Sequence, residues 1–289
     1  MKIGIIGGSG AMGKWFARQA LAEKFEVMIS GRDGVKLQNA GKELNVSTGS
    51  NIDIAKHCQV VIISVTPSQF EAVVQEIAPF IREEQYIADL TSVKTVPVSV
   101  MHRYIKKGKI LGTHPVFGPG AKNFTNQNVV LTPVTPAEQV LANRIKTWLE
   151  QHGASVSIMT PEEHDRIMTV VLGLAHFIAI VSADTLLGFD NFAEMKKIGG
   201  TTFKVLYTLV ESVISEDPQL YASLQMSFPR IAEVEAQFLN NSTAWAEMVK
   251  KGDRDGFAAK MAALHAKLET TDPSFRQAYA NMYKITEKL

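Results

Sequence analysis

The spacing of hydrophobic residues divides the chain into two parts. Over residues 1–160, short runs rich in Val and Ile alternate with longer stretches whose apolar residues recur at helical spacing. Strands are predicted at Lys2–Ile6, Glu26–Ser30, Val60–Val65, Tyr86–Leu90, Ile110–Thr113, Val129–Thr132 and Ser155–Met159. Helices are predicted between several of them, at Gly13–Lys24, Pro67–Ile81 and Pro136–Gln151. This alternation is typical of a doubly wound, mostly parallel α/β sheet.

After Thr160-Pro161 the pattern changes to helical spacing alone. Such spacing is found at Phe203–Ile214, Ile231–Leu239, Phe257–Leu268 and Phe275–Ile285. A length of 289 residues suits two domains. We therefore predict an α/β domain over residues 1–160 and an all-α domain over residues 161–289.

Composition indicates an ordinary globular protein. Hydrophobic residues make up 46% of the chain, charged residues 20%, and the net charge is +1. A charge so near zero argues against nucleic acid or an anionic membrane as a partner. The single cysteine, Cys58, excludes an internal disulfide, and no leader precedes the opening MKIGIIG, so we expect a cytoplasmic protein.

One apolar segment, Ile167–Ala183, carries no Asp, Glu, Lys or Arg. It is only just long enough to cross a hydrocarbon core of about 30 Å. Because it contains His176 and runs into Asp184, we predict burial against protein, with a subunit interface of a homodimer as the expected place.

A glycine-rich loop follows the first predicted strand and opens the first predicted helix. Its residues are Gly8, Ser9, Gly10, Ala11, Met12 and Gly13, which form G-x-G-x-x-G. In this context the pattern predicts a Rossmann dinucleotide site, with Gly8 in the tight turn and Gly10 beside the pyrophosphate. Gly13 would let the helix pack closely on the strand. A glycine-rich turn without a ligand is the alternative.

The end of the second predicted strand bears on which dinucleotide binds. NAD sites usually place an acidic residue there to bond the ribose hydroxyls, but this chain has Ser30 and then Arg32. Arg32 can pair with a 2′-phosphate and Ser30 can donate a hydrogen bond to it, so we predict NADP. NAD stays open because Asp33 could reach the ribose, and Arg32 and Asp33 could also be ordinary surface charges.

Polar residues follow three other predicted strands: Val65-Thr66-Pro67, the stretch 89–94 (DLTSVK), and Thr113-His114-Pro115. The carboxyl ends of parallel strands lie at one edge of a sheet, where ligands bind. We therefore expect Ser92 and His114 to meet above the nicotinamide. Histidine is well suited to take a proton near neutral pH, and glycines and prolines frame His114 closely.

Two further histidines lie in the second half. His164 follows Glu162 and Glu163, so a capping or surface role is as plausible as a functional one. His176 has apolar neighbours and is either a core histidine or a functional one. The two lie about 18 Å apart along one helix and cannot share a metal, and the sequence shows no metal-binding or G-x-S-x-G pattern.

The chain resembles the prephenate and arogenate dehydrogenases of tyrosine biosynthesis. The likeness rests on GGSGAMG at 7–13, DLTSVK at 89–94, THPVFGPGA at 113–121 and PEEHDRIMTVVLGLAHF at 161–177, with the weaker SEDPQLYASLQM at 215–226. It covers nearly the whole chain. It implies a Rossmann domain followed by a helical dimerisation domain.

The resemblance also implies a reaction, the oxidative decarboxylation of a cyclohexadienol with hydride transfer to a nicotinamide. His114 matches the catalytic histidine, which bonds the C4 hydroxyl and helps to remove its proton. Ser92 matches a serine that orients this histidine, and His176 matches a histidine of the substrate pocket.

The chain departs from the resemblance at one position. Many members carry a carboxylate-binding arginine five residues before the Asp of the Asp-Pro turn, where this chain has Ser212. Lys204 and Arg230 are the substitutes that we predict. The gap leaves prephenate, arogenate and an amino analogue of prephenate open as substrates.

Two other functions stay open at this point. One is another NADP-linked reductase with a helical second domain, such as a 3-hydroxyacid or pyrroline carboxylate type. The other is a dinucleotide-binding regulatory module without turnover. The polar set of Ser92, His114 and His176 favours the dehydrogenase over both.

Overall fold

The structure is a computed structural model that describes residues 1–287, and its chain divides into two compact units. The first comprises Met1–Met168 together with Met226–Pro229, and the second comprises Thr169–Gln225 and the residues from Arg230 onward. The predicted boundary after residue 160 lies just before the long helix Pro161–Leu187. The two units divide within this helix, after Met168. That boundary stays a prediction.

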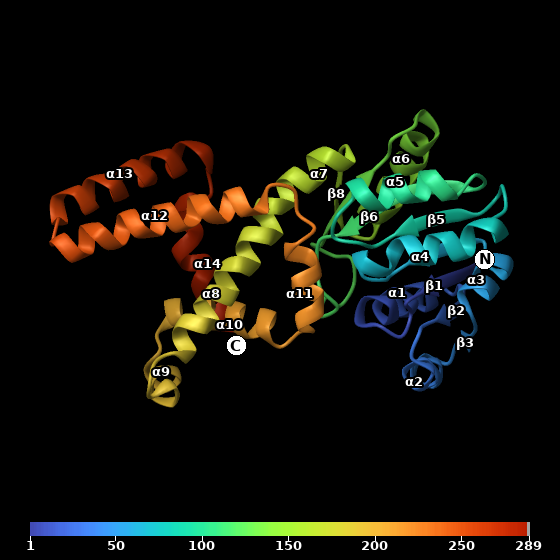
Figure 1. Cartoon of the computed structure of the whole chain (residues 1–289), viewed down its shortest axis with the longest axis horizontal. Helices are drawn as coiled ribbons and strands as arrows, with labels where there is room; N and C mark the ends of the chain where they lie inside the picture. Colours follow the sequence, from blue (N-terminus) through green and yellow to red (C-terminus); the bar gives the residue numbers. More distant parts are fainter. Residues whose placement is uncertain (288–289) are drawn as a thin grey trace. The chain divides into compact units, whose positions relative to one another are not determined.

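The first unit is built on one eight-stranded sheet (Figure 1). Its strands are β1 (Lys2–Ile6), β2 (Glu26–Ser30), β3 (Ser47–Thr48), β4 (Val60–Ile63), β5 (Tyr86–Asp89), β6 (Lys109–Pro115), β7 (Asn128–Thr132) and β8 (Ser155–Ile158). They lie in the order β3-β2-β1-β4-β5-β6-β7-β8. All neighbours run parallel except β6 and β7, so the predicted doubly wound, mostly parallel sheet is confirmed.

Helices cover both faces of this sheet. They are α1 (Ala11–Ala22), α2 (Gly34–Leu44), α3 (Asn51–His57), α4 (Pro67–Ile77) with a 3-10 turn at Ala78–Phe80, α5 (Thr95–Tyr104), α6 (Pro136–Gln151) and α7 (Pro161–Met168). Alternate residues of β1 pack against the helices on opposite faces of the sheet. Ile3 and Ile5 pack with α1 and α2, whereas Ile6 packs with α3 and α4. This is why the strand is apolar at nearly every position.

A third apolar cluster joins α1 and α6 to the strands β6, β7 and β8. Its centre is Trp15, whose ring lies edge-on to Phe117 at 4.9 Å and to Phe124 at 5.0 Å. The indole N–H of Trp15 donates to the carbonyl of Ala121. These contacts hold the segment after His114 against α1, and the partly buried Phe117 packs against this cluster.

The second unit is helical throughout the part that the structure describes. A π-helical turn at Thr169–Leu174 leads into α8 (Ala175–Leu187), followed by α9 (Phe192–Ile198), α10 (Thr201–Ile214), α11 (Pro218–Gln225), α12 (Ile231–Lys251), α13 (Arg254–Thr271), a 3-10 turn at Phe275–Gln277 and α14 (Ala278–Thr286). Helix α10 packs against α8 and α14, and α12 packs against α13. Figure 1 shows α12 and α13 as a hairpin, which turns at Gly252 with a φ of +68°.

The apolar segment around His176 forms part of one long helix, Pro161–Leu187. This helix is long and apolar enough to span a membrane, yet only 17% of its most apolar window is buried within the chain. Val170, Val171 and Leu187 are 51%, 48% and 67% exposed. The predicted burial is therefore not provided by the chain itself.

Candidate active site

The loop between β1 and α1 makes its tight turn at Gly7. Gly7 has a φ of +80°, and a Cβ there would lie 2.1 Å from the carbonyl oxygen of Ser64. The turn thus falls one residue before Gly8, to which the sequence pattern assigned it. A Cβ on Gly8 would lie 2.6 Å from the Ile29 side chain, so Gly8 allows the loop to pack on β2.

The same loop leaves the start of α1 open for an anion. A Cβ on Gly13 would lie 2.4 Å from the Gly7 carbonyl, so only glycine lets the helix begin this close to the turn. Gly10 is the N-cap and brings no side chain to bond the first amides. The N–H groups of Ala11 and Met12 have no partner inside the helix, which suits a pyrophosphate.

Ser30 lies at the end of β2 and is buried. Its hydroxyl donates to Oδ1 of Asn51 at 2.7 Å, and the Asn51 amide donates to Glu76 at 2.7 Å. A bond from Ser30 to a phosphate would have to replace the bond to Asn51.

Arg32 and Asp33 follow Ser30 and have different surroundings. Arg32 is exposed. The Asp33 carboxylate caps α2 by accepting a hydrogen bond from the backbone N–H of Lys36 at 3.0 Å. The carboxylate that could have served an NAD ribose is therefore engaged as a helix cap.

The stretch Val65-Thr66-Pro67 joins β4 to α4. Thr66 is the N-cap of that helix and Pro67 is its first residue. Because β1 and β4 are neighbours, this stretch and the glycine loop flank the point where the strand order reverses. That point is where open α/β sheets bind dinucleotides.

His114 lies within β6 rather than after it. The strand was predicted to end at Thr113 but runs from Lys109 to Pro115. Its last residues pair antiparallel with β7, with His114 opposite Val130 and Pro115 opposite Val129. The sheet ladder, more than the glycines and prolines that follow, therefore holds the backbone of His114.

A buried chain of three side chains runs from His114. Nδ1 of His114 lies 2.8 Å from Nε2 of His164, and Nδ1 of His164 lies 2.7 Å from Oδ1 of Asp165. His164 is fully buried and His114 is 3% exposed. The surface alternative for His164 is therefore wrong, because α7 turns this histidine inward.

The Asp165 carboxylate is held by the start of α5. Oδ1 accepts the backbone N–H of Lys94 at 2.6 Å, and Oδ2 accepts that of Thr95 at 2.9 Å. Burial raises the pKa of Asp165, but the hydrogen bonds from His164, Thr95 and Lys94 outweigh it, so the pKa lies below its usual value. Asp165 is thus an ionised acceptor in a fixed position.

A buried ion pair adjoins Thr113, the residue before His114. The ammonium group of Lys94 bonds the Asp89 carboxylate, and both side chains are fully buried. Lys94 Nζ also donates to the carbonyl of Thr113 at 2.5 Å, and Asp89 Oδ1 accepts the Thr113 N–H at 3.1 Å. The pair therefore holds both backbone groups of the residue before His114.

These surroundings decide the charge of His114. Burial lowers the pKa of His114 well below 6.5, and the nearby Lys94 ammonium and His164 lower it further. Burial also lowers the pKa of Lys94, which Asp89 opposes. His114 is consequently a neutral imidazole near neutral pH, as a general base must be.

Ser92 is half-buried between the buried residues Thr91 and Val93. It lies in the loop after β5, on the edge predicted for it. The hydrogen bond at Nδ1 of His114 is made by His164. A contact between Ser92 and the other side of His114 stays a prediction.

His176 lies on α8, in the second unit. Its ring is edge-on to Tyr221 of α11, with centroids 4.9 Å apart. Burial lowers the pKa of His176, and within residues 1–287 its buried Nδ1 has no hydrogen-bond partner. Gln225, one turn after Tyr221, donates to the carbonyl of Gly173 at 3.0 Å. An unpartnered imidazole nitrogen suits a ligand, and the sequence argument missed Tyr221.

The two predicted carboxylate-binding residues are both exposed. Lys204 lies on α10. Arg230 has a φ of 56°, and its guanidinium makes several hydrogen bonds to the Glu233 carboxylate. To bind a substrate carboxylate, Arg230 would have to exchange that partner.

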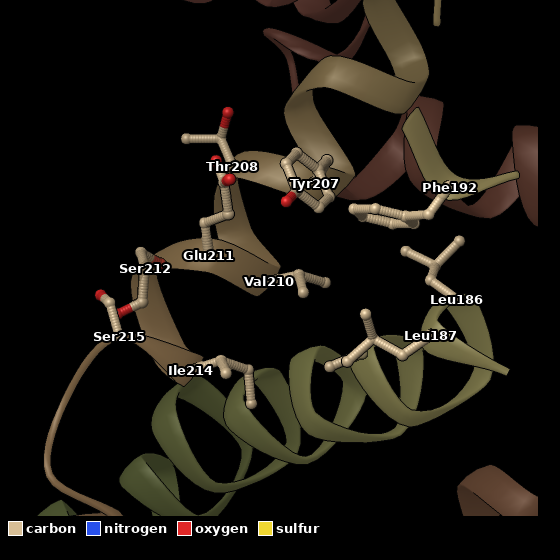
Figure 2. A pocket seen from close by; sticks show the side chains of 11 residues that line it. Leu186, Leu187, Phe192, Tyr207, Thr208, Val210, Glu211, Ser212, Ile214 and Ser215 are labelled. Carbon is tan, nitrogen blue, oxygen red and sulfur yellow. The ribbon is translucent and has the colours of Figure 1, made fainter. Parts of the chain in front are cut away.

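Ser212 lines a cavity of about 640 Å³ between α8 and α10 (Figure 2). Its hydroxyl donates to the carbonyl of Leu209. Figure 2 shows Leu186, Leu187 and Phe192 facing this space. The carboxylate in its lining is Glu211, so the cavity is unsuited to an anionic group.

Signals for His164 and Asp165 were present in the sequence. Pro161, His164, Asp165 and Met168 are the buried residues of α7, and their spacing is that of one helix face. The acidic residues Glu162 and Glu163 lie on the other face. Among residues 1–287, no group of three His, Cys, Asp or Glu side chains could hold a metal ion.

Comparison with known families gives two matches that together span most of the chain. The nucleotide-binding domain of prephenate dehydrogenase matches residues 16–158, and its dimerization domain matches residues 160–263. The chain belongs to the prephenate dehydrogenase family. The fold and family implied by the sequence motifs are thus confirmed.

Two relatives within this family align over most of the chain. The probable arogenate/prephenate dehydrogenase of Methanocaldococcus jannaschii is 38% identical over 271 residues, which cover 92% of this chain and 61% of that protein. The T-protein of Haemophilus influenzae is 26% identical over 259 residues, which cover 89% of this chain and 64% of that protein. The chain therefore spans a little under two thirds of the length of these relatives.

The fold is also that of a solved member of the family. Prephenate dehydrogenase from A. aeolicus, crystallised in complex with hydroxyphenyl propionate and NAD+, has a TM-score of 0.76 with 19% identity. The match covers 94% of this chain and 98% of that one. At this identity the likeness concerns the fold.

Proposed function

We propose that the protein catalyses the oxidative decarboxylation of prephenate, or of arogenate, with hydride transfer to NADP. The products are 4-hydroxyphenylpyruvate and tyrosine, respectively. The observation that carries the proposal is His114, a buried and neutral imidazole at the edge of the sheet where the glycine loop lies. Membership of the prephenate dehydrogenase family supports it.

The residues of the loop fit a dinucleotide. Gly7, Gly8 and Gly13 leave no room for a Cβ, and the amides at the start of α1 are open to a pyrophosphate. A dinucleotide held there would supply an acceptor for the hydride that leaves C4 of the substrate ring. The chain must then place the C4 hydroxyl against a base and keep that base neutral.

His114 supplies this base. The lone pair on its Nε2 accepts a hydrogen bond from the C4 hydroxyl and takes its proton as the hydride leaves. The ring carboxylate departs as CO₂, and its bonding electrons make the ring aromatic. We place Ser92 beside the hydroxyl and His176 against the substrate, as the resemblance implies.

NADP is proposed over NAD because Arg32 is exposed beside the glycine loop, whereas Asp33 is engaged as the cap of α2. Ser30 is a weaker contributor because its hydroxyl already donates to Asn51. The carboxylate of the substrate side chain is assigned to Lys204 or Arg230. If Lys204→Ala and Arg230→Ala each leave the substrate KM unchanged, both assignments fail.

The test is the absorbance at 340 nm with prephenate and with arogenate, each supplied with NADP and with NAD. We expect a rise with one or both substrates and NADP, and a smaller kcat/KM with NAD. Tight NADP binding without any rise would favour the regulatory module and contradict the proposal.

A further inference from the structure

The geometry points to a function for His164 that the proposed reaction does not yet use. We propose that His114 and His164 together form a closed proton store, which holds the substrate hydroxyl proton during the reaction and returns it to the same oxygen. The inference rests on the proposed function. It concerns where one proton lies at each step.

The hydrogen bonds determine the tautomers of both rings. An ionised carboxylate only accepts, so Nδ1 of His164, 2.7 Å from Asp165 Oδ1, carries a hydrogen. In neutral His164, Nε2 is then a lone pair, and it accepts from Nδ1–H of His114 across 2.8 Å. The same logic leaves Nε2 of His114 without a hydrogen and ready to take one.

Uptake of the substrate proton shifts the hydrogens along the chain of hydrogen bonds from His114 to His164. As Nε2 of His114 takes the hydroxyl proton, the hydrogen on its Nδ1 passes to Nε2 of His164. His114 remains neutral with its hydrogen on the other nitrogen, and His164 becomes an imidazolium bonded to the Asp165 carboxylate. The positive charge thus lies beside an anion rather than on the ring nearest the Lys94 ammonium.

The chemistry of the substrate requires the proton to come back. Loss of hydride and proton converts the C4 alcohol into a carbonyl. Departure of CO₂ then pushes an electron pair through the ring to that oxygen and forms a phenolate. The phenolate takes the proton from Nε2 of His114, and the hydrogen on Nε2 of His164 returns to Nδ1 of His114. No proton is gained or lost overall, which suits a pair with 3% and 0% exposure.

Three charged groups surround the pair. Lys94 lies at the start of α5, Asp89 lies on β5, and Asp165 lies on α7. Asp89 and Lys94 neutralise each other, and Asp165 is the carboxylate within hydrogen-bond distance of an imidazole. His164 is therefore a positioning residue, which acts on the substrate only through His114.

The first test needs no turnover. Long-range ¹H–¹⁵N NMR of the free protein near pH 8 reports which imidazole nitrogens carry hydrogen. We expect both Nδ1 atoms to be protonated and Nε2 of His114 to be bare. A hydrogen on Nε2 of His114 in the free protein would overturn the proposal, whether or not prephenate is a substrate.

The second test replaces His164 by glutamine. The Gln carbonyl can accept from Nδ1–H of His114 and so keep its tautomer, but it cannot hold a proton. We expect H164Q to lower kcat by about tenfold or more with KM unchanged, and to move the acid limb of the pH profile lower. The proton inventory in mixed H₂O and D₂O should change from curved to linear.

His57→Gln, an exposed histidine at the end of α3, is the matched control and should change none of these quantities. If H164Q keeps the kcat, the acid limb and the curved proton inventory of the unaltered protein, the proton store is refuted. If the unaltered protein turns over neither prephenate nor arogenate, the proposed function is refuted instead. The NMR result would still decide the tautomers.

Discussion

At His114 the protein keeps an imidazole neutral by burying it near an ammonium group. A histidine in water is half protonated near pH 6.5. An exposed imidazole would therefore be partly protonated at neutral pH, and the protonated fraction could not act as a base. Burial and Lys94 together shift the balance toward the neutral ring. The consequence reaches beyond catalysis, because a shifted pKa couples folding to pH.

This coupling predicts that stability falls in acid. Below about pH 6.5 the unfolded chain protonates His114, while the folded chain resists that proton until lower pH. The unfolded state therefore binds more protons, and each pH unit below 6.5 lowers the free energy of unfolding by about 1.4 kcal/mol. Urea unfolding at several pH values measures this slope. His114→Gln should flatten it, and an unchanged slope would contradict the assignment.

The Asp89–Lys94 pair predicts a second effect at the scale of one residue. Lys94→Met leaves the Asp89 carboxylate buried without its partner, which should cost about 3–5 kcal/mol in the free energy of unfolding. Lys14→Met is the control, because its partner Glu43 is exposed and its loss should matter much less. Urea unfolding compares the two. Equal losses would show that the buried pair does not hold this part of the fold.

The sequence predicted His114 but not its partners. His114 was recognisable because a polar residue in a glycine-rich frame followed an apolar strand. His164 was ambiguous because Glu162 and Glu163 make its local sequence look solvated, whereas its burial depends on a carboxylate contact with α5, which is about 70 residues away in the chain. Only the helix face shared with Pro161 and Met168 could have indicated it.

Among the elements, the bounds of three were predicted to the residue. Strands β1 and β2 and helix α6 begin and end at the predicted residues. The two-residue strand β3 was missed because Ser47 and Thr48 carry no apolar pattern and are ordered by pairing with β2. Strand β6 extends beyond its apolar run because β7 pairs with its last residues. Pairing between strands is a tertiary effect that local patterns do not report.

The loop after β2 predicts cofactor preference at the scale of an element. Arg32→Ala should raise the KM for NADP by about tenfold or more, since one charge-assisted pair to phosphate is lost, and should leave the KM for NAD nearly unchanged. Lys42→Ala, at the far end of α2, is the control. Initial rates at 340 nm with varied NADP and NAD check this. Equal effects on both cofactors would contradict a role for Arg32 at a 2′-phosphate.

At the scale of the whole molecule, the change from alternating to purely helical spacing anticipated a sheet-based unit followed by a helical one. What it could not show was how little the chain buries its most apolar helix. An exposed apolar face of this kind calls for a partner surface. The family's second domain is described as a dimerization domain, which makes a second copy the natural occupant.

We therefore predict a dimer in solution that depends on this helix. Replacing both Val170 and Val171 by Glu should give a folded monomer, because these side chains are about half exposed within one chain. Val140→Glu on α6, at 62% exposure, is the control and should remain dimeric. Light scattering coupled to size exclusion measures the mass. A monomer in the unaltered protein, or a dimer in the double variant, would contradict the prediction.

The central claim, that His114 is the base of an oxidative decarboxylation, is tested most directly by His114→Asn. NADP affinity measured by titration should be unchanged, because the glycine loop is untouched. The kcat with the better of prephenate and arogenate should fall by about 10²- to 10⁴-fold, the usual range for a lost general base. A His114→Asn protein that binds NADP normally and turns over at the original rate would contradict the account.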